Sequence, residues 1–169
     1  YDLLTSGISV VSAHTCWDSA VGGVNDTLAA LLGFENVQPL ELEETATPMA
    51  RIAEVEPMTG EELALLVKEK LGCHLRLADS GKTITRVALC GGSASSLVYE
   101  AIGKADAFIT GDLSHHVFLD AADSGMTVIA AGHFETENPS MKPLTEKLKE
   151  KFEDIDFVLI EQENPVKYY

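Results

Sequence analysis

The chain has 169 residues, of which 46% are hydrophobic and 23% are charged. This composition fits one globular domain and excludes a disordered or fibrous chain. The formal net charge of -15 argues against nucleic acid as a partner, because affinity for a phosphate backbone comes from clustered Lys and Arg. No run approaches the roughly 20 apolar residues that a membrane span requires, so we expect no membrane partner either.

The three cysteines are Cys16, Cys73 and Cys90, which are far apart and outside any C-x-x-C pair. An odd number at such spacing predicts neither a disulfide framework nor a structural zinc site. We therefore expect a protein of the reducing cytoplasm.

The first part of the sequence mixes extended and helical patterns. β-Branched and apolar runs predict strands at 8–14, 37–43 and 50–57, and apolar residues at helical spacing predict a helix at 18–33. Thr59, with Glu62 three residues later, forms a capping-box pattern before an amphipathic run that stops at Gly72. The region 60–71 is therefore the most clearly predicted helix.

From residue 74 the predicted elements become more regular. D-S-G-K predicts a turn that joins strands 74–79 and 84–90 in a hairpin. Further strands are predicted at 105–110, 126–132 and 157–162, and helices at 94–104, 113–125 and 139–152. Strands that alternate with helices predict an α/β fold with a mixed, largely parallel sheet flanked by helices.

The strongest candidate site is A-G-H-F-E-T-E at 131–137, directly after a predicted strand. His133 and Glu137 are four residues apart, so a helical turn would place both side chains on one face. Imidazole and carboxylate together suit Zn, Fe, Mn or Ni. The alternative is a helix start with exposed polar residues.

A second candidate is S-A-H-T-C-W-D at 12–18, which ends in Asp18. Asp18 could bind a metal ion or could cap the following helix. His14 and Cys16 are possible further ligands. The alternatives are a histidine at the core edge and a small buried cysteine.

Two further motifs follow predicted strands. I-T-G-D-L-S-H-H at 109–116 contains Asp112, a possible helix cap, and His115 and His116, which would point about 100° apart on a helix. C-G-G-S-A at 90–94 is similar to a phosphate-binding turn but lacks the full spacing of such motifs.

Together these motifs resemble those of the GTP cyclohydrolase 1 type 2 homologue family, also called the Nif-three-like dinuclear metal-centre family. The resemblance runs nearly end to end, through S-A-H-T-C-W-D-S-A-V-G-G-V-N-D, R-V-A-L-C-G-G-S-A, A-D-A-F-I-T-G-D-L-S-H-H and A-A-G-H-F-E-T-E. It implies a two-lobed Nif-three-like α/β fold, a homohexamer arranged as a toroid, and two divalent metal ions per subunit that face its cavity.

By this resemblance, Asp18 and His133 are metal ligands, Glu137 is a bridging carboxylate, and His116 is a catalytic, substrate-facing proton shuttle. The resemblance also implies a metal-dependent hydrolase that acts on a nucleotide-like small molecule. The alternative is a non-catalytic oligomeric scaffold that binds metal or protein partners.

The sequence departs from the family at two places. The His-His-Pro motif that precedes the Asp18 segment in the family is absent, and Cys16 and Trp17 replace the usual asparagine and leucine. We therefore expect an amino-terminally truncated chain, with a first-lobe remnant at 1–57 and a second lobe at 58–169. A third possibility follows, in which the shortened site binds metal weakly or not at all.

Overall fold

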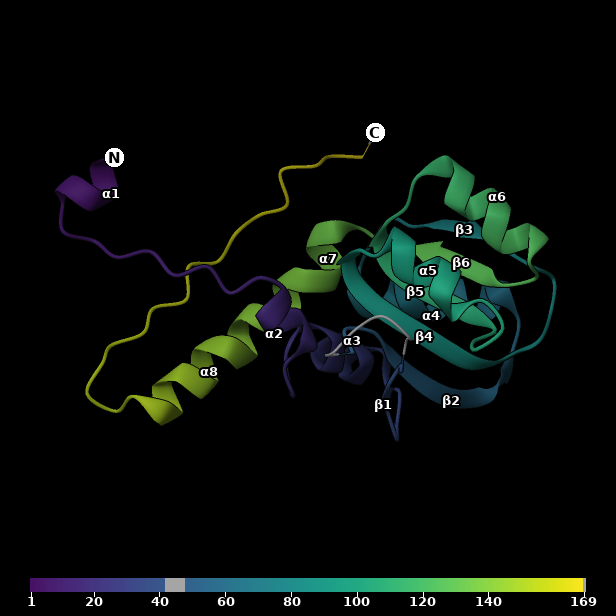
Figure 1. The fold of residues 1–169 in the computed structure, drawn as a ribbon, viewed down its shortest axis with the longest axis horizontal. Coiled ribbons are helices and arrows are strands. Elements are labelled where there is room, and N and C mark those ends of the chain that lie inside the picture. Colours follow the sequence, from purple (N-terminus) through teal and green to yellow (C-terminus); the bar gives the residue numbers. More distant parts are fainter. Residues whose placement is uncertain (42–47, 169) are drawn as a thin grey trace.

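The computed structural model describes residues 1–41 and 48–168, which form a mixed α/β fold (Figure 1). The strands are β1 (Gln38–Pro39), β2 (Arg51–Met58), β3 (Arg76–Ala78), β4 (Ile84–Ser93), β5 (Ala107–Asp112) and β6 (Thr127–Ala130). The helices are α1 (Asp2–Thr5), α2 (Thr15–Ser19), α3 (Val24–Leu32), α4 (Gly60–Leu71), α5 (Ser95–Ala101), α6 (His115–Asp123), α7 (His133–Glu137), the 3₁₀ turn η1 (Asn138–Ser140) and α8 (Met141–Lys151).

The described strands form one sheet in the order β1-β2-β4-β5-β6-β3. The central pairs β4–β5 and β5–β6 are parallel, whereas β1–β2, β2–β4 and β3–β6 are antiparallel. The predicted mixed α/β fold is confirmed, but parallel pairing is limited to the centre of the sheet. This places the carboxyl ends of β4, β5 and β6 at one edge.

Both faces of the sheet are covered by helices. Strand residues alternate between the faces, and Phe108 packs on the face of α5 and α6 while its neighbour Ile109 packs on the face of α3 and α4. Both side chains are fully buried. Because each face has its own apolar layer, the central strands read as continuous apolar runs rather than as alternating ones.

The predicted helix at 60–71 is confirmed, together with its cap. The Glu62 N–H donates to the Thr59 hydroxyl at 3.2 Å, and the Thr59 N–H donates to the Glu62 carboxylate at 2.8 Å. These two bonds satisfy amide groups that the first helical turn leaves without partners. The helix ends at Gly72, whose φ of 61° is the left-handed conformation that favours glycine.

The predicted hairpin is wrong. β3 pairs with β6 rather than with β4, and β4 lies between β2 and β5. The turn at 79–83 therefore crosses from one edge of the sheet to its interior instead of joining neighbours. Local turn residues allow a chain reversal, but burial of apolar strands on both faces decides which strands pair.

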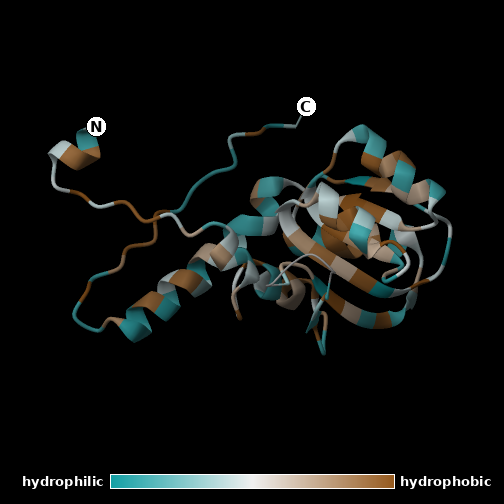
Figure 2. Cartoon of the chain, viewed as in Figure 1, coloured by the Kyte–Doolittle hydropathy of each residue, from teal (hydrophilic) through white to brown (hydrophobic). Residues whose placement is uncertain are grey.

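The strands predicted at 8–14 and 157–162 are also wrong, because both segments lack regular secondary structure. Both segments lie outside the sheet (Figure 1), and Figure 2 shows apolar residues along them. The strand predicted at 37–43 shortens to β1, and residues 42 and 43 lie outside the described part of the chain. β2 lies in the predicted first lobe and β4 in the predicted second lobe, yet both belong to one sheet. The division into lobes near residue 57 therefore stays a prediction.

In the described ranges 1–41 and 48–168, no helix is both long and apolar enough to cross a bilayer.

Candidate metal centre

The candidate site lies where the parallel strands end. β5 ends at Asp112, and β6 is followed by Gly132 and then by α7, which begins at His133 and ends at Glu137. Since β5 and β6 are neighbours in the sheet, their carboxyl ends bring Asp112 beside α7. This is the edge at which open α/β sheets bind ligands.

His133 lies between two carboxylates. Its Nδ1 is 2.7 Å from Asp112 Oδ2, and its Nε2 is 3.2 Å from Glu137 Oε1. The hydrogen bond to Asp112 favours a proton on Nδ1, which leaves the Nε2 lone pair on the side of Glu137. Histidines that bind metal are commonly oriented in this way by a carboxylate on the other ring nitrogen.

Two glycines make room for these side chains. A Cβ at Gly92, whose φ is +67°, would collide with Glu137 Oε1 and lie 3.3 Å from His133 Nε2. A Cβ at Gly111 would lie 2.8 Å from the His133 Cα. Gly92 also sits at an irregularity in the pairing of β4 with β5, and such bulges are frequent beside functional sites.

The similarity of C-G-G-S-A to a phosphate-binding turn, already incomplete in its spacing, does not hold in the structure. Gly91 and Gly92 lie inside β4, and their N–H groups are already bonded. The Gly91 N–H donates to Asn25 Oδ1 at 2.7 Å, and the Gly92 N–H donates to Thr136 Oγ1 at 3.1 Å. These amides fix α3 and α7 to the sheet and are not free for a phosphate.

Asp18 reaches the same site from the amino-terminal part of the chain. It lies in the short helix α2 rather than at its N-cap, which is His14. The buried Asn25 side chain donates to the Asp18 carbonyl at 3.0 Å and to the Met49 carbonyl at 2.8 Å. Asn25 thus ties α2 to the start of β2 and to the end of β4.

The environment opposes ionisation of the two candidate ligand carboxylates. Burial raises the pKa of Asp18, while His14 and His133 act in the opposite direction. Burial also raises the pKa of Glu137, and it outweighs the opposite effect of His133, which is itself larger than the further rise caused by Asp18. Carboxylates held close together at this cost are typical of sites that a cation completes.

Asp18, Asp112, His133 and Glu137 line one cavity of about 530 Å³. Within residues 1–41 and 48–168, however, no three His, Cys, Asp or Glu side chains are already arranged so that they could hold a metal ion. The donor set of one imidazole and two carboxylates, the oriented His133 and the space at Gly92 nevertheless fit a divalent cation.

Of the other candidate ligands, His14 lines this cavity, whereas the cysteines at positions 16, 73 and 90 do not. Cys16 is exposed, against the expectation of a buried side chain, and Cys73 and Cys90 are buried. Burial raises the pKa of Cys90 to about 12, although Asn25 opposes the shift; such a thiol is a poor metal ligand.

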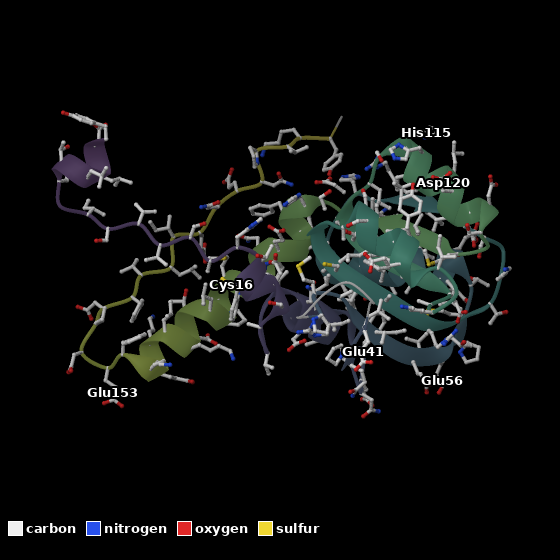
Figure 3. The ribbon with its side chains drawn as sticks, in the orientation of Figure 1. Cys16, Glu41, Glu56, His115, Asp120 and Glu153 are labelled. Atoms are coloured by element: carbon white, nitrogen blue, oxygen red, sulfur yellow. The ribbon has the colours of Figure 1, made fainter. Side chains whose placement is uncertain are left out.

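His116 does not line the cavity. It is exposed in the first turn of α6, with Nε2 3.3 Å from Ser114 Oγ, and the neighbouring His115 lies at the outer surface of that helix (Figure 3). Asp112 does not cap α6, whose N-cap is Ser114. The catalytic role of His116 stays a prediction, whereas Asp112 is the residue near His133 that sequence reasoning missed.

The chain is thus a mixed α/β protein with an imidazole and carboxylates at the ends of its parallel strands, the edge at which such folds commonly bind small molecules. Comparison with known proteins narrows this class. The model of the family Duf34/NIF3 (NGG1p interacting factor 3) matches residues 1–165, and the chain belongs to that family.

Its relatives include a "GTP cyclohydrolase 1 type 2 homolog" of Clostridium perfringens, 34% identical over 93% of this chain and 63% of the relative. A "Protein NIF3 homolog" of Schizosaccharomyces pombe is 37% identical over 89% of this chain and 58% of the relative. Staphylococcus aureus protein SA1388 has a similar structure, with a TM-score of 0.84 at 25% identity over 99% of this chain and 71% of that one. The chain thus spans about three fifths of the curated relatives.

Proposed function

We propose that this chain binds divalent metal through Asp18, His133 and Glu137 and belongs to a metal-dependent hydrolase that acts on a nucleotide-like small molecule. One observation carries the proposal. His133 is held by Asp112 at 2.7 Å so that its Nε2 faces Glu137, in a cavity that Asp18 also lines.

The roles of the residues follow from this geometry. Asp112 orients the imidazole, Gly92 leaves space for the donor atoms, and Asn25 positions the backbone of Asp18. A divalent ion bound there would lower the pKa of a water molecule toward about 7 and polarise the bond under attack. The hydrolase class and the nucleotide-like substrate are supported by relatives named as GTP cyclohydrolase 1 type 2 homologs.

We also propose that copies of the chain assemble, as the resemblance to a hexameric family implies. Val11 is 93% exposed and Val158 is 83% exposed, and exposed apolar side chains of this kind are buried when subunits associate. Light scattering should therefore give a mass of several chains, and a clean monomer would contradict the proposal.

The test of the metal site is elemental analysis of purified variants after incubation with Zn²⁺ or Mn²⁺, together with loss of the purine absorbance of guanosine or of GTP. Glu137→Gln should lose metal and activity, because an amide is a weaker ligand than a carboxylate. Cys73→Ser, a matched control in the buried core, should retain both. Full metal occupancy in Glu137→Gln would remove this residue from the site.

A further inference from the structure

The candidate ligands occupy only part of their cavity, and aromatic and aliphatic side chains line much of the rest. Trp17 of α2, Phe134 of α7 and Tyr168 near the end of the chain contribute to its wall. Trp17 is only 9% exposed, and its indole N–H donates to Ser140 Oγ at 3.1 Å, which fixes the ring. The volume of about 530 Å³ lies within the range of small-molecule sites, about 300–1,000 Å³.

The carboxy-terminal segment closes one side of this cavity. Asn164 Nδ2 donates to Glu135 Oε1 at 2.8 Å, and the ring of Tyr168 lies 4.7 Å from that of His74. These two contacts hold residues 164–168 against α7 and against the loop after α4. Tyr168 and Pro165 thereby line the same cavity as the candidate metal ligands.

The same cavity carries an excess of negative groups. Four carboxylates line it, namely those of Asp18, Asp112, Glu135 and Glu137. Among its described lining residues there is no Lys or Arg, and the whole chain has a net charge of -15. Glu135 Oε2 is buried and has no hydrogen-bond partner in the described residues.

This excess of negative charge should favour an uncharged base or nucleoside over the same compound with phosphate groups. Two divalent ions would only balance the four carboxylates and leave no net positive charge in the cavity to attract a triphosphate. An uncharged planar ring meets no such repulsion, and stacking on aromatic side chains contributes about 1–3 kcal/mol per base. The walls thus favour the ring part of a nucleotide, and the carboxylates disfavour its phosphates.

We propose that this cavity takes an uncharged, planar nitrogen heterocycle of nucleobase or nucleoside size and discriminates against its phosphorylated form. The inference rests on the proposed function for the place of reaction and adds the class of substrate. It departs from GTP, the compound in the names of the relatives.

The test uses Trp17 as a probe, because it is the single tryptophan of the chain and lines the cavity. Guanosine and GTP, which share the same ring system, are titrated against the chain, first with a chelator and then with saturating Zn²⁺. Guanosine should quench the fluorescence and bind at least about tenfold more tightly than GTP. Added salt should strengthen GTP binding in the chelator and leave guanosine binding unchanged.

A matched pair of variants tests the electrostatic cause. Glu135→Gln removes one cavity charge and keeps an oxygen that can accept from Asn164, so GTP should bind a few-fold more tightly while guanosine is unaffected. Glu153→Gln removes the same charge beyond the far end of α8 (Figure 3) and should change neither. Equal effects of the two variants on the affinity for GTP would overturn the inference.

The inference also fails if GTP binds as tightly as guanosine in either state, or if guanosine binds in neither. Metal binding is measured separately by elemental analysis. A chain that takes up no metal would refute the proposed function, while the titrations in chelator would still decide the inference.

Discussion

Strand β6 and the segment at 8–14 place similar residues in opposite surroundings. Val128 and Ile129 are fully buried in β6, whereas Val10 and Val11 are 70% and 93% exposed. β6 has hydrogen-bonded neighbours on both sides, β5 and β3, but residues 8–14 pair with no described strand. Apolar, β-branched residues therefore become a strand only where partner strands satisfy their backbone groups.

The first prediction compares the sheet with an extended segment outside it, using the free energy of unfolding. Phe108→Ala removes a fully buried ring from the central strand β5 and should lower the free energy of unfolding by about 3–5 kcal/mol. Glu161→Ala changes an exposed, polar side chain of the carboxy-terminal segment and should change the free energy of unfolding by less than about 0.5 kcal/mol. Chemical denaturation measures both, and similar losses would remove the distinction.

The second prediction tests the ion pair that joins the sheet to α2 and α3. Arg51 of β2 is buried, its Nε bonds Asp26 Oδ1, and its guanidinium also donates to the Ser19 carbonyl. Arg51→Met leaves Asp26 without its partner and should cost about 3 kcal/mol. The double variant with Asp26→Leu should recover part of this loss in the same denaturation experiment, and no recovery would show that the pair is not the cause.

A smaller effect is expected at the start of α4. Thr59→Ala removes the hydroxyl that accepts the Glu62 N–H and should cost about 1 kcal/mol. The matched control is Thr83→Ala, at an exposed position outside the helices and strands. Thermal unfolding should show a lower Tm for Thr59→Ala alone, and equal Tm values would show that the capping box contributes nothing.

The smallest effect concerns acid stability. Burial raises the pKa of Asp106, but hydrogen bonds from the N–H and hydroxyl of Thr85 and from the Arg86 N–H outweigh it, so the pKa lies below its ordinary value of 3.8. The charged form therefore stabilises the fold above pH 3.8, and this contribution is lost as the pH falls through the lowered pKa. Asp106→Asn should be less stable than the parent at pH 6, and the difference should vanish in acid. A difference independent of pH would contradict this assignment.

The parts of the fold that were predictable are those in which local pattern and tertiary partners agree. The helix at 60–71 has its own cap, and β5 and β6 are apolar on both faces, so the sequence suffices. The prediction of a hairpin was wrong because D-S-G-K indicates a turn but does not indicate which strand lies next to β4. The prediction of strands at 8–14 and 157–162 was wrong because a local run of apolar residues does not show whether a pairing strand is available.

The site was predictable to a similar extent. Asp18, His133 and Glu137 do line one cavity, as the spacing and the resemblance led us to expect. The role of Asp112 was missed because T-G-D reads locally as a helix cap, and its contact with His133 depends on β5 and β6 being neighbours. The space at Gly92 likewise depends on how α7 packs against β4.

A crystal structure of the chain grown with Zn²⁺, with the ion located by anomalous scattering, would show whether Asp18, His133 and Glu137 bind metal. We expect a peak within about 2.0–2.2 Å of His133 Nε2 and of a carboxylate oxygen of Asp18 or Glu137, with the Asp112 to His133 hydrogen bond retained. An ion bound elsewhere, with His133 and Glu137 still in contact, would contradict the account.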